Sequence, residues 1–218
     1  MFGMTTYEKL FENNRRWVAD RTADDPSYFE ELAKGQQPRF LFIGCSDSRV
    51  PADRITGSQA GEMLVHRNVA NVVVPTDLNL MSVLQLAVEV LKVEHVIVCG
   101  HYGCNGVASA VDGKAHGLID KWLYAIKDVY RIHRHELDAI SDPNEKRRRL
   151  VELNVREAVY RVSSTSFVQR AWSTERAVHV HGWVYDIRDG LLRDLEIDPD
   201  RDFDGSEIYQ LANIGPKP

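Results

Sequence analysis

The sequence predicts an α/β fold: a mostly parallel central sheet with an antiparallel edge strand, flanking helices and an N-terminal helical arm. Residues 40–44 and 95–100 are apolar runs with the length of buried strands, and 62–69 is a third strand-like segment. Between them, residues 78–93 have apolar side chains at helical spacing and no Gly or Pro, which predicts the crossover helix of a right-handed βαβ unit. Residues 177–197 contain two strand-like segments joined by an Asp-Gly turn, which predicts a hairpin that adds the antiparallel strand.

The N-terminal segment predicts two helices, at 5–18 and 27–33. The first carries a stripe of apolar side chains at helical spacing: Tyr7, Leu10, Phe11, Trp17 and Val18. Because such a stripe is poorly suited to water, we expect this arm to cover a partner subunit. The chain is therefore divided into a helical arm (1–35), an α/β core (36–198) and a C-terminal surface tail (199–218).

Two long, charged helical stretches follow the 95–100 strand. Residues 117–140 and 145–172 are separated by Ser-Asp-Pro-Asn, and the Ser/Thr-rich run 163–166 could end the second helix early. The basic run 146–149 is typical of a solvated helix face, since the chain as a whole is acidic.

Composition excludes several classes of protein. The chain has 218 residues, 44% hydrophobic content and a net charge of -5, so it can fill a sizeable core but offers no basic surface for nucleic acid or anionic membranes. No run approaches the ~20 apolar residues of a membrane span, and the first ten residues do not resemble a signal peptide. We therefore expect a cytoplasmic globular protein.

Two of the three cysteines and one histidine follow directly on predicted strands. Cys45 comes after 40–44, and His101 and Cys104 come after 95–100. The carboxyl ends of parallel strands meet at one edge, where α/β sheets place ligand sites. Two thiolates and an imidazole suit zinc, and three protein ligands leave a fourth position open, as in catalytic zinc sites. The odd number of cysteines fits a reducing compartment.

The remaining cysteine and histidines have plainer interpretations. Cys99 lies inside an apolar strand and fits a small buried hydrophobe. We expect His133 and His135 on an exposed helix surface, and His179 and His181, which alternate along a strand, as ordinary surface or core side chains.

Asp47 and Arg49 lie on the loop that begins at Cys45. Their simplest interpretation is a salt bridge. Because Cys45 is a predicted metal ligand, however, Asp47 lies within reach of the fourth metal position, and Arg49 can hold its carboxylate in a bidentate pair.

These motifs resemble those of the β-class carbonic anhydrases. The two family motifs, CxDxR and HxxC, stand here at 45–49 and 101–104. The similarity also includes VHRNVAN at 65–71 and HGWVY at 181–185, and it extends over about residues 7–197. The chain looks closest to the bacterial branch of the family.

The resemblance implies reversible hydration of carbon dioxide to bicarbonate and a proton, by attack of zinc-bound hydroxide. One Zn²⁺ per subunit would be held by Cys45, His101 and Cys104. Asp47 would orient the hydroxide, and Arg49 would keep Asp47 ionised and off the metal. The family also implies an arm that wraps a neighbouring subunit and a homodimer, often paired into a homotetramer.

The resemblance assigns a substrate pocket to Gln36, Leu64 and Leu86. Many members have glutamine, phenylalanine and tyrosine at these positions, so both aromatic positions are leucine here. The pocket stays apolar, which suits carbon dioxide, but it has fewer hydroxyl donors.

A noncatalytic bicarbonate site of some members maps to Phe42, Arg67 and Tyr185. The family uses Trp, Arg and Tyr, so Phe42 removes the indole donor and we expect this inhibitory site to be weak or absent.

The fourth zinc position distinguishes two states in the family. In the closed state, the aspartate of the first motif, here Asp47, is the fourth ligand; in the open state it pairs with the arginine, here Arg49. We expect the open state near or above neutral pH and closure only under more acidic conditions, because protonation makes the resident hydroxide easier to displace.

Two other functions stay open at this point. A hydrolase of carbonyl sulfide or carbon disulfide can share the fold, and the changes at Leu64 and Leu86 keep this alternative open. An inactive, zinc-stabilised interaction protein is the other alternative. Intact Asp47 and Arg49 count against it, because a structural zinc site does not need them.

Overall fold

The computed structural model describes residues 5–174, 176, 178–199 and 206–212. The chain divides into two compact units, 1–37 and 38–218, and each is described by itself.

The first unit consists of two helices, α1 (Thr6–Asp24) and α2 (Tyr28–Ala33). Thr5 caps α1 through a capping box with Glu8, which satisfies free backbone N–H groups at the helix start. The Trp17 ring packs edge-on against the Phe29 ring, with 5.3 Å between centroids. Both predicted helices are confirmed, and α1 continues six residues beyond the predicted end at Val18.

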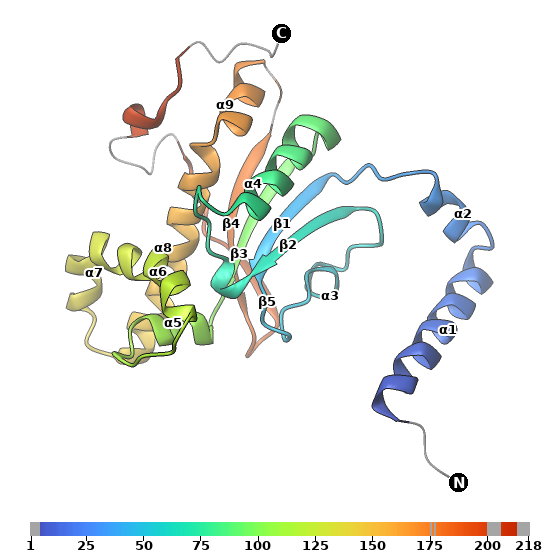
Figure 1. The fold of residues 1–218 in the computed structure, drawn as a ribbon, viewed down its shortest axis with the longest axis horizontal. Coiled ribbons are helices and arrows are strands. Elements are labelled where there is room, and N and C mark those ends of the chain that lie inside the picture. Colours follow the sequence, from blue (N-terminus) through green and yellow to red (C-terminus); the bar gives the residue numbers. More distant parts are fainter. Residues whose placement is uncertain (1–4, 175, 177, 200–205, 213–218) are drawn as a thin grey trace. The chain divides into compact units, whose positions relative to one another are not determined.

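The second unit is built on a five-stranded sheet in the order β2-β1-β3-β4-β5 (Figure 1). Its strands are β1 (Phe40–Cys45), β2 (Met63–Asn68), β3 (His95–His101), β4 (His179–Asp186) and β5 (Leu191–Asp194). The first four strands are parallel, and only β5 runs antiparallel, against β4. This arrangement confirms the predicted fold class.

The predicted crossover helix is present as α4 (Leu78–Gln85), capped by the Asp77 carboxylate. It continues without interruption into a π-helical turn, η2 (Leu86–Leu91), and ends at Lys92, which has a φ of 58°. The π turn was not predicted, since apolar spacing does not distinguish a local i→i+5 turn from an α-helix.

The helical layer contains the two predicted stretches, each divided in two. The elements are α6 (Ile119–Ile132), α7 (Arg134–Ala139), α8 (Pro143–Ser163) and α9 (Ser166–Ser173). The Ser/Thr run at 163–166 does end α8, at Ser163. The structure adds short elements that were not predicted: α3 (Ala52–Thr56), η1 (Val69–Asn71), α5 (Asn105–Ala110) and η3 (Ser206–Tyr209).

The sheet has an apolar core on each face, because successive side chains of a strand point to opposite sides. On one face, Leu41 and Ile43 join the large core that includes the buried side of α8. On the other face, Phe42, Ile97 and Cys99 form a smaller cluster. The sheet is therefore covered on both faces where the strands are most apolar.

Gly182 of β4 marks a close approach between the sheet, α8 and Ile197. A Cβ atom at this position would lie 3.1 Å from both Val155 and Val159 and 2.5 Å from Ile197. We expect Gly182→Ala to lower the free energy of unfolding by about 1–3 kcal/mol, the usual cost of overpacking. Urea unfolding of the zinc-loaded protein measures the change.

The double variant Gly182→Ala/Ile197→Ala provides the control for this prediction. Shortening Ile197 removes the tightest of the three contacts. The alanine at 182 should then cost less in the Ile197→Ala background than in the wild type. An equal cost in both backgrounds would contradict the steric explanation.

Candidate metal centre

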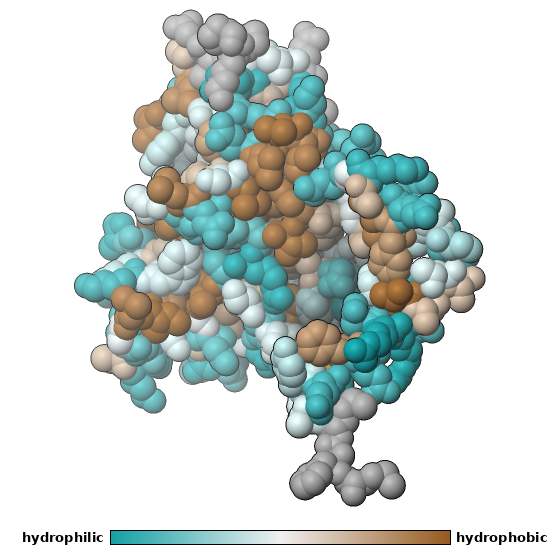
Figure 2. All heavy atoms as spheres, turned by 45° about the vertical axis from the view of Figure 1, so that its right-hand side comes forward, coloured by the Kyte–Doolittle hydropathy of each residue, from teal (hydrophilic) through white to brown (hydrophobic). Residues whose placement is uncertain are grey.

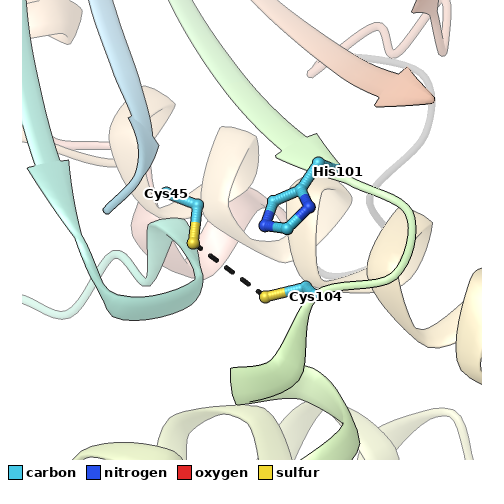
Figure 3. Close-up of side chains that lie close together, drawn as sticks. All are labelled: Cys45, His101 and Cys104. Atoms are coloured by element: carbon cyan, nitrogen blue, oxygen red, sulfur yellow. Dashed lines mark hydrogen bonds between the residues drawn. The ribbon is translucent and has the colours of Figure 1, made fainter. Parts of the chain in front are cut away.

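Three side chains predicted as metal ligands meet at the carboxyl edge of the sheet. Cys45 is the last residue of β1, His101 is the last residue of the adjacent strand β3, and Cys104 immediately precedes α5. Figure 3 shows the three side chains pointing toward one another. The parallel pairing of β1 with β3 brings residues more than fifty positions apart in sequence to the same edge.

The spacing of the ligand atoms suits a single zinc ion. The sulfur atoms of Cys45 and Cys104 are 4.0 Å apart, and the three ligand atoms all lie within 4.8 Å of one another. Two thiolates at the usual Zn–S length of about 2.3 Å in tetrahedral geometry lie about 3.8 Å apart. All three residues are buried, with exposed fractions of 5% for each cysteine and 0% for His101.

His101 presents one ring nitrogen to this cluster. Its Nδ1 lies 3.2 Å from the carbonyl oxygen of Tyr102, to which it donates, so Nε2 carries the lone pair. Nε2 is buried, has no hydrogen-bond partner among the described residues and lies 3.8 Å from Asp47 Oδ2. A buried polar atom without a partner is costly. A metal ion at the two sulfur atoms would satisfy it.

Cys45 differs from the other two cysteines in acidity. A hydrogen bond from Cys104 lowers the pKa of Cys45 to about 4, whereas the same contact raises the pKa of Cys104. A bound cation would favour loss of the proton from Cys104 as well. Burial raises the pKa of Cys99 to about 12, which fits the structural role predicted for it.

Asp47 and Arg49 form the predicted bidentate pair beside the cluster. Arg49 Nε donates to Asp47 Oδ1 at 2.9 Å, and Arg49 Nη2 donates to Oδ2 at 2.7 Å. The Arg49 backbone N–H donates a third hydrogen bond to Oδ1 at 3.0 Å. These bonds from Arg49 hold the pKa of Asp47 well below its usual range, so the carboxylate is ionised and turned toward Arg49.

Arg67 of β2 fastens the loop that carries this pair. Its guanidinium donates to the carbonyl oxygens of Cys45, at 2.7 Å, and Asp47, at 2.5 Å. The sequence resemblance assigns Arg67 only to a bicarbonate site. Its role in the loop depends on the β1–β2 register, in which Gly44 is paired with Arg67, and no local pattern reveals that register.

A further contact at Cys45, and one that supports it, have no counterpart in the sequence prediction. The backbone N–H of Ala70 donates to Cys45 Sγ at 3.3 Å, in a turn where Ala70 has a φ of 61°. The Asn154 side chain of α8 donates to the Ala70 carbonyl at 3.0 Å and holds this turn. An N–H bond to sulfur stabilises the thiolate form. An alanine in the left-handed conformation has no signature in the sequence.

The predicted substrate-pocket residues are distributed over both units. Gln36 belongs to the 1–37 unit, so its position relative to the other two is not described. Leu64 is half-buried against the large core, and Leu86 lies on the π turn, 39% exposed. A cavity of about 460 Å³ does adjoin the centre, with Arg49 and Cys104 in its lining. The grouping of Gln36, Leu64 and Leu86 as one pocket stays a prediction.

The predicted bicarbonate residues lie in three strands of the sheet: Phe42 in β1, Arg67 in β2 and Tyr185 in β4. Phe42 is fully buried in the smaller core, and Tyr185 packs at the edge of the same cluster. Arg67 uses its Nε and one Nη atom on backbone carbonyls. A joint anion site of these three residues stays a prediction.

Comparison with known proteins gives one consistent family. The sequence profile described as "Carbonic anhydrase" matches residues 40–192. A carbonic anhydrase of Emericella nidulans is 52% identical over 95% of this chain and 91% of its own. The structure of the β-carbonic anhydrase CafA of Aspergillus fumigatus superposes with a TM-score of 0.89 at 36% identity, over 98% of this chain and all of the other.

A tetrameric β-carbonic anhydrase of Sordaria macrospora is also similar, with a TM-score of 0.84 at 39% identity over 88% of this chain and 98% of the other. The expected placement in the bacterial branch is not supported. A Pseudomonas aeruginosa carbonic anhydrase is 31% identical, well below the 52% of the Emericella protein.

Proposed function

Since this chain belongs to the β-class carbonic anhydrase family, we propose that Cys45, His101 and Cys104 hold one zinc ion per subunit and that Asp47 and Arg49 complete the site. Carbonic anhydrases interconvert carbon dioxide and water with bicarbonate and a proton, and this chain is an enzyme of that class. The observation that supports the ligand assignment best is the partnerless Nε2 of buried His101, which faces two sulfur atoms 4.0 Å apart.

Each group at this site has a separate role in the reaction. Zinc, when bound, would lower the pKa of a water molecule, so that attack on carbon dioxide becomes feasible near neutral pH. The Asp47 carboxylate accepts a hydrogen bond from the attacking water and fixes its orientation. Arg49 keeps Asp47 ionised and holds it in place through two parallel hydrogen bonds. The pairing of Asp47 with Arg49 supports the open state, and closure by Asp47 as fourth ligand is reserved for acidic conditions.

Carbon dioxide hydration measured by stopped flow, with zinc content determined on the same sample, tests this function. We expect activity to rise in proportion to bound zinc up to one ion per subunit. Hydrolysis of carbonyl sulfide or carbon disulfide without carbon dioxide hydration would contradict the proposal, as would zinc-loaded protein with neither activity.

The helical arm and the edge of the sheet support self-association into a dimer or a tetramer. No residue of α1 is buried, and the exposed fractions of Tyr7 and Leu10 are 69% and 62%. In the core unit, Val65 of edge strand β2 and Val90 of η2 are also exposed. Figure 2 shows apolar side chains, in brown, gathered in a patch on the face of the core unit turned to the viewer. Patches of this kind mark interfaces.

Light scattering at micromolar concentration checks this assembly. We expect a mass of at least twice the 24.8 kDa of one chain. Phe11→Asp should lower the mass, since it places a charge in the apolar stripe, whereas Glu12→Gln on the same helix should not. A stable wild-type monomer of 24.8 kDa would contradict the prediction.

We also propose a cytoplasmic location. All three cysteines are free and buried, as expected for a protein of a reducing compartment. Among the described residues, no helix combines the length and the apolar character needed to span a bilayer.

A further inference from the structure

Three histidines form one cluster on the face of the sheet that carries the smaller apolar core. The sequence alone gave no reason to group them. His95 begins β3, and His179 and His181 lie at the start of the neighbouring strand β4. His95 is paired with His179 in the register, and His181 lies on the same face because it is two residues further along. β3 runs from His95 to His101, so this cluster lies at the opposite end of the sheet from the candidate metal centre, roughly 20 Å away at the usual rise per residue.

The imidazole rings contact one another directly. His95 Nδ1 and His181 Nε2 are 3.0 Å apart. The His179 ring stacks on His95 with 5.4 Å between centroids and lies 6.3 Å from His181. On its other side, His95 stacks on Phe40 at 5.4 Å. The His95 ring is thus held between two aromatic neighbours, and its orientation is fixed before any ligand arrives.

Both hydrogen-bonded imidazoles favour the neutral form. Burial lowers the pKa of His95, and the neighbouring His179 and Arg39 lower it further, while Glu94 acts in the opposite direction. Burial also lowers the pKa of His181, with a second contribution from His95 and an opposing one from Asp194. Neutral imidazole binds metal ions through its lone-pair nitrogen. One of the two nitrogens that are 3.0 Å apart donates in their hydrogen bond, so on metal binding this ring moves its proton to its other nitrogen, and both imidazoles stay neutral.

We propose that His95 and His181, with His179 as a third ligand, bind one divalent transition-metal ion of the class that imidazole prefers: Ni²⁺, Cu²⁺ or Zn²⁺. Two nitrogen ligands at about 2.0–2.1 Å from one ion lie about 2.9–3.4 Å apart for angles of 90–110° at the ion. The 3.0 Å between His95 Nδ1 and His181 Nε2 falls in this range. His179 is exposed, so its ring can turn toward the ion.

This site differs in chemistry from the Cys45–His101–Cys104 centre. It offers only imidazole nitrogen atoms as ligands, and one of its three histidines, His179, is exposed. The other centre offers two thiolates and an imidazole, all from buried residues. Zinc therefore fills the thiolate centre first, and the histidine cluster takes a second ion more weakly. The proposal does not depend on the catalytic function of the chain.

Equilibrium dialysis of the full-length, zinc-loaded protein against Ni²⁺ tests the proposal, with nickel and zinc measured separately by mass spectrometry. We expect one Ni²⁺ per subunit in addition to the retained zinc. His181→Gln and His95→Gln should each weaken Ni²⁺ binding by about tenfold or more, since each removes a direct ligand. His135→Gln, which removes a lone exposed imidazole on α7, is the matched control and should bind like the wild type. Circular dichroism confirms folding, and His179→Gln at the exposed position offers a third variant with little risk to the fold.

Fluorescence provides a second measurement, since the Trp183 ring lies 6.3 Å from His181. Bound Ni²⁺ should quench the emission of Trp183, and the Trp183→Phe variant should lose this quenching while still binding Ni²⁺. Equal Ni²⁺ affinity in the wild type and in folded His95→Gln and His181→Gln variants would overturn the proposal. So would Ni²⁺ uptake that releases an equal amount of zinc, because the nickel would then occupy the thiolate centre.

Discussion

Cys104→Ser is expected to bind almost no zinc and to lose carbon dioxide hydration by more than about 100-fold. Serine is nearly the same size, but its hydroxyl does not ionise near neutral pH and is a poor zinc ligand. Even the loss of a residue that only orients a ligand costs 10- to 100-fold in metal affinity, so the loss of a direct ligand should cost more. Zinc content after dialysis and stopped-flow hydration measure the two effects on one sample.

Cys99→Ser is the matched control for this variant. Cys99 is also buried, but it lies inside β3 in the smaller apolar core and is not one of the three residues whose ligand atoms lie together. We expect this variant to retain zinc and activity, with some loss of stability from the buried hydroxyl. The ligand assignment would be wrong if Cys99→Ser lost zinc and Cys104→Ser kept it.

The meeting of Cys45, His101 and Cys104 could be predicted from the sequence because each residue follows a strand that is itself easy to predict. Cys45 and His101 come directly after apolar runs bounded by glycine, and parallel strands bring their ends to one edge. The Asp47–Arg49 pair was predictable for a similar reason, since both residues lie on one short loop. Local sequence is therefore sufficient to predict a contact in two cases: when both residues lie on one loop, and when both follow parallel strands whose carboxyl ends meet at one edge of the sheet.

Contacts that depend on register were not predictable. Arg67 reaches the Cys45 loop because β2 pairs with β1 at one particular register, and Asn154 reaches Ala70 from a helix more than eighty residues away. The histidine cluster is a further example. His95 stood in one predicted strand and His181 in another, and only the β3–β4 pairing places their nitrogen atoms 3.0 Å apart.

Asp47→Asn is expected to lower kcat for carbon dioxide hydration by about 10²- to 10⁴-fold, the range for loss of a positioned proton acceptor, while zinc stays bound. Asparagine keeps the shape of the side chain but presents an amide nitrogen in place of one carboxylate oxygen. Arg49 can then no longer make two charge-assisted bonds. The attacking water loses its anionic acceptor, although the three ligands are unchanged.

The pH dependence separates the role of Asp47 from that of its neighbours. Its pKa in the folded protein is held below the ordinary value of 3.8, chiefly by the hydrogen bonds from Arg49. The pair is therefore intact above the ordinary pKa and is lost only as the pH falls through the depressed value. Between about pH 5 and 8 Asp47 stays ionised, so Asp47→Asn should lower the rate across this whole range and not only at its acidic end. Asp53→Asn, in a surface pair with Arg54 on α3, should leave the profile unchanged. An Asp47→Asn enzyme with wild-type kcat and full zinc content would show that the carboxylate takes no part in the reaction.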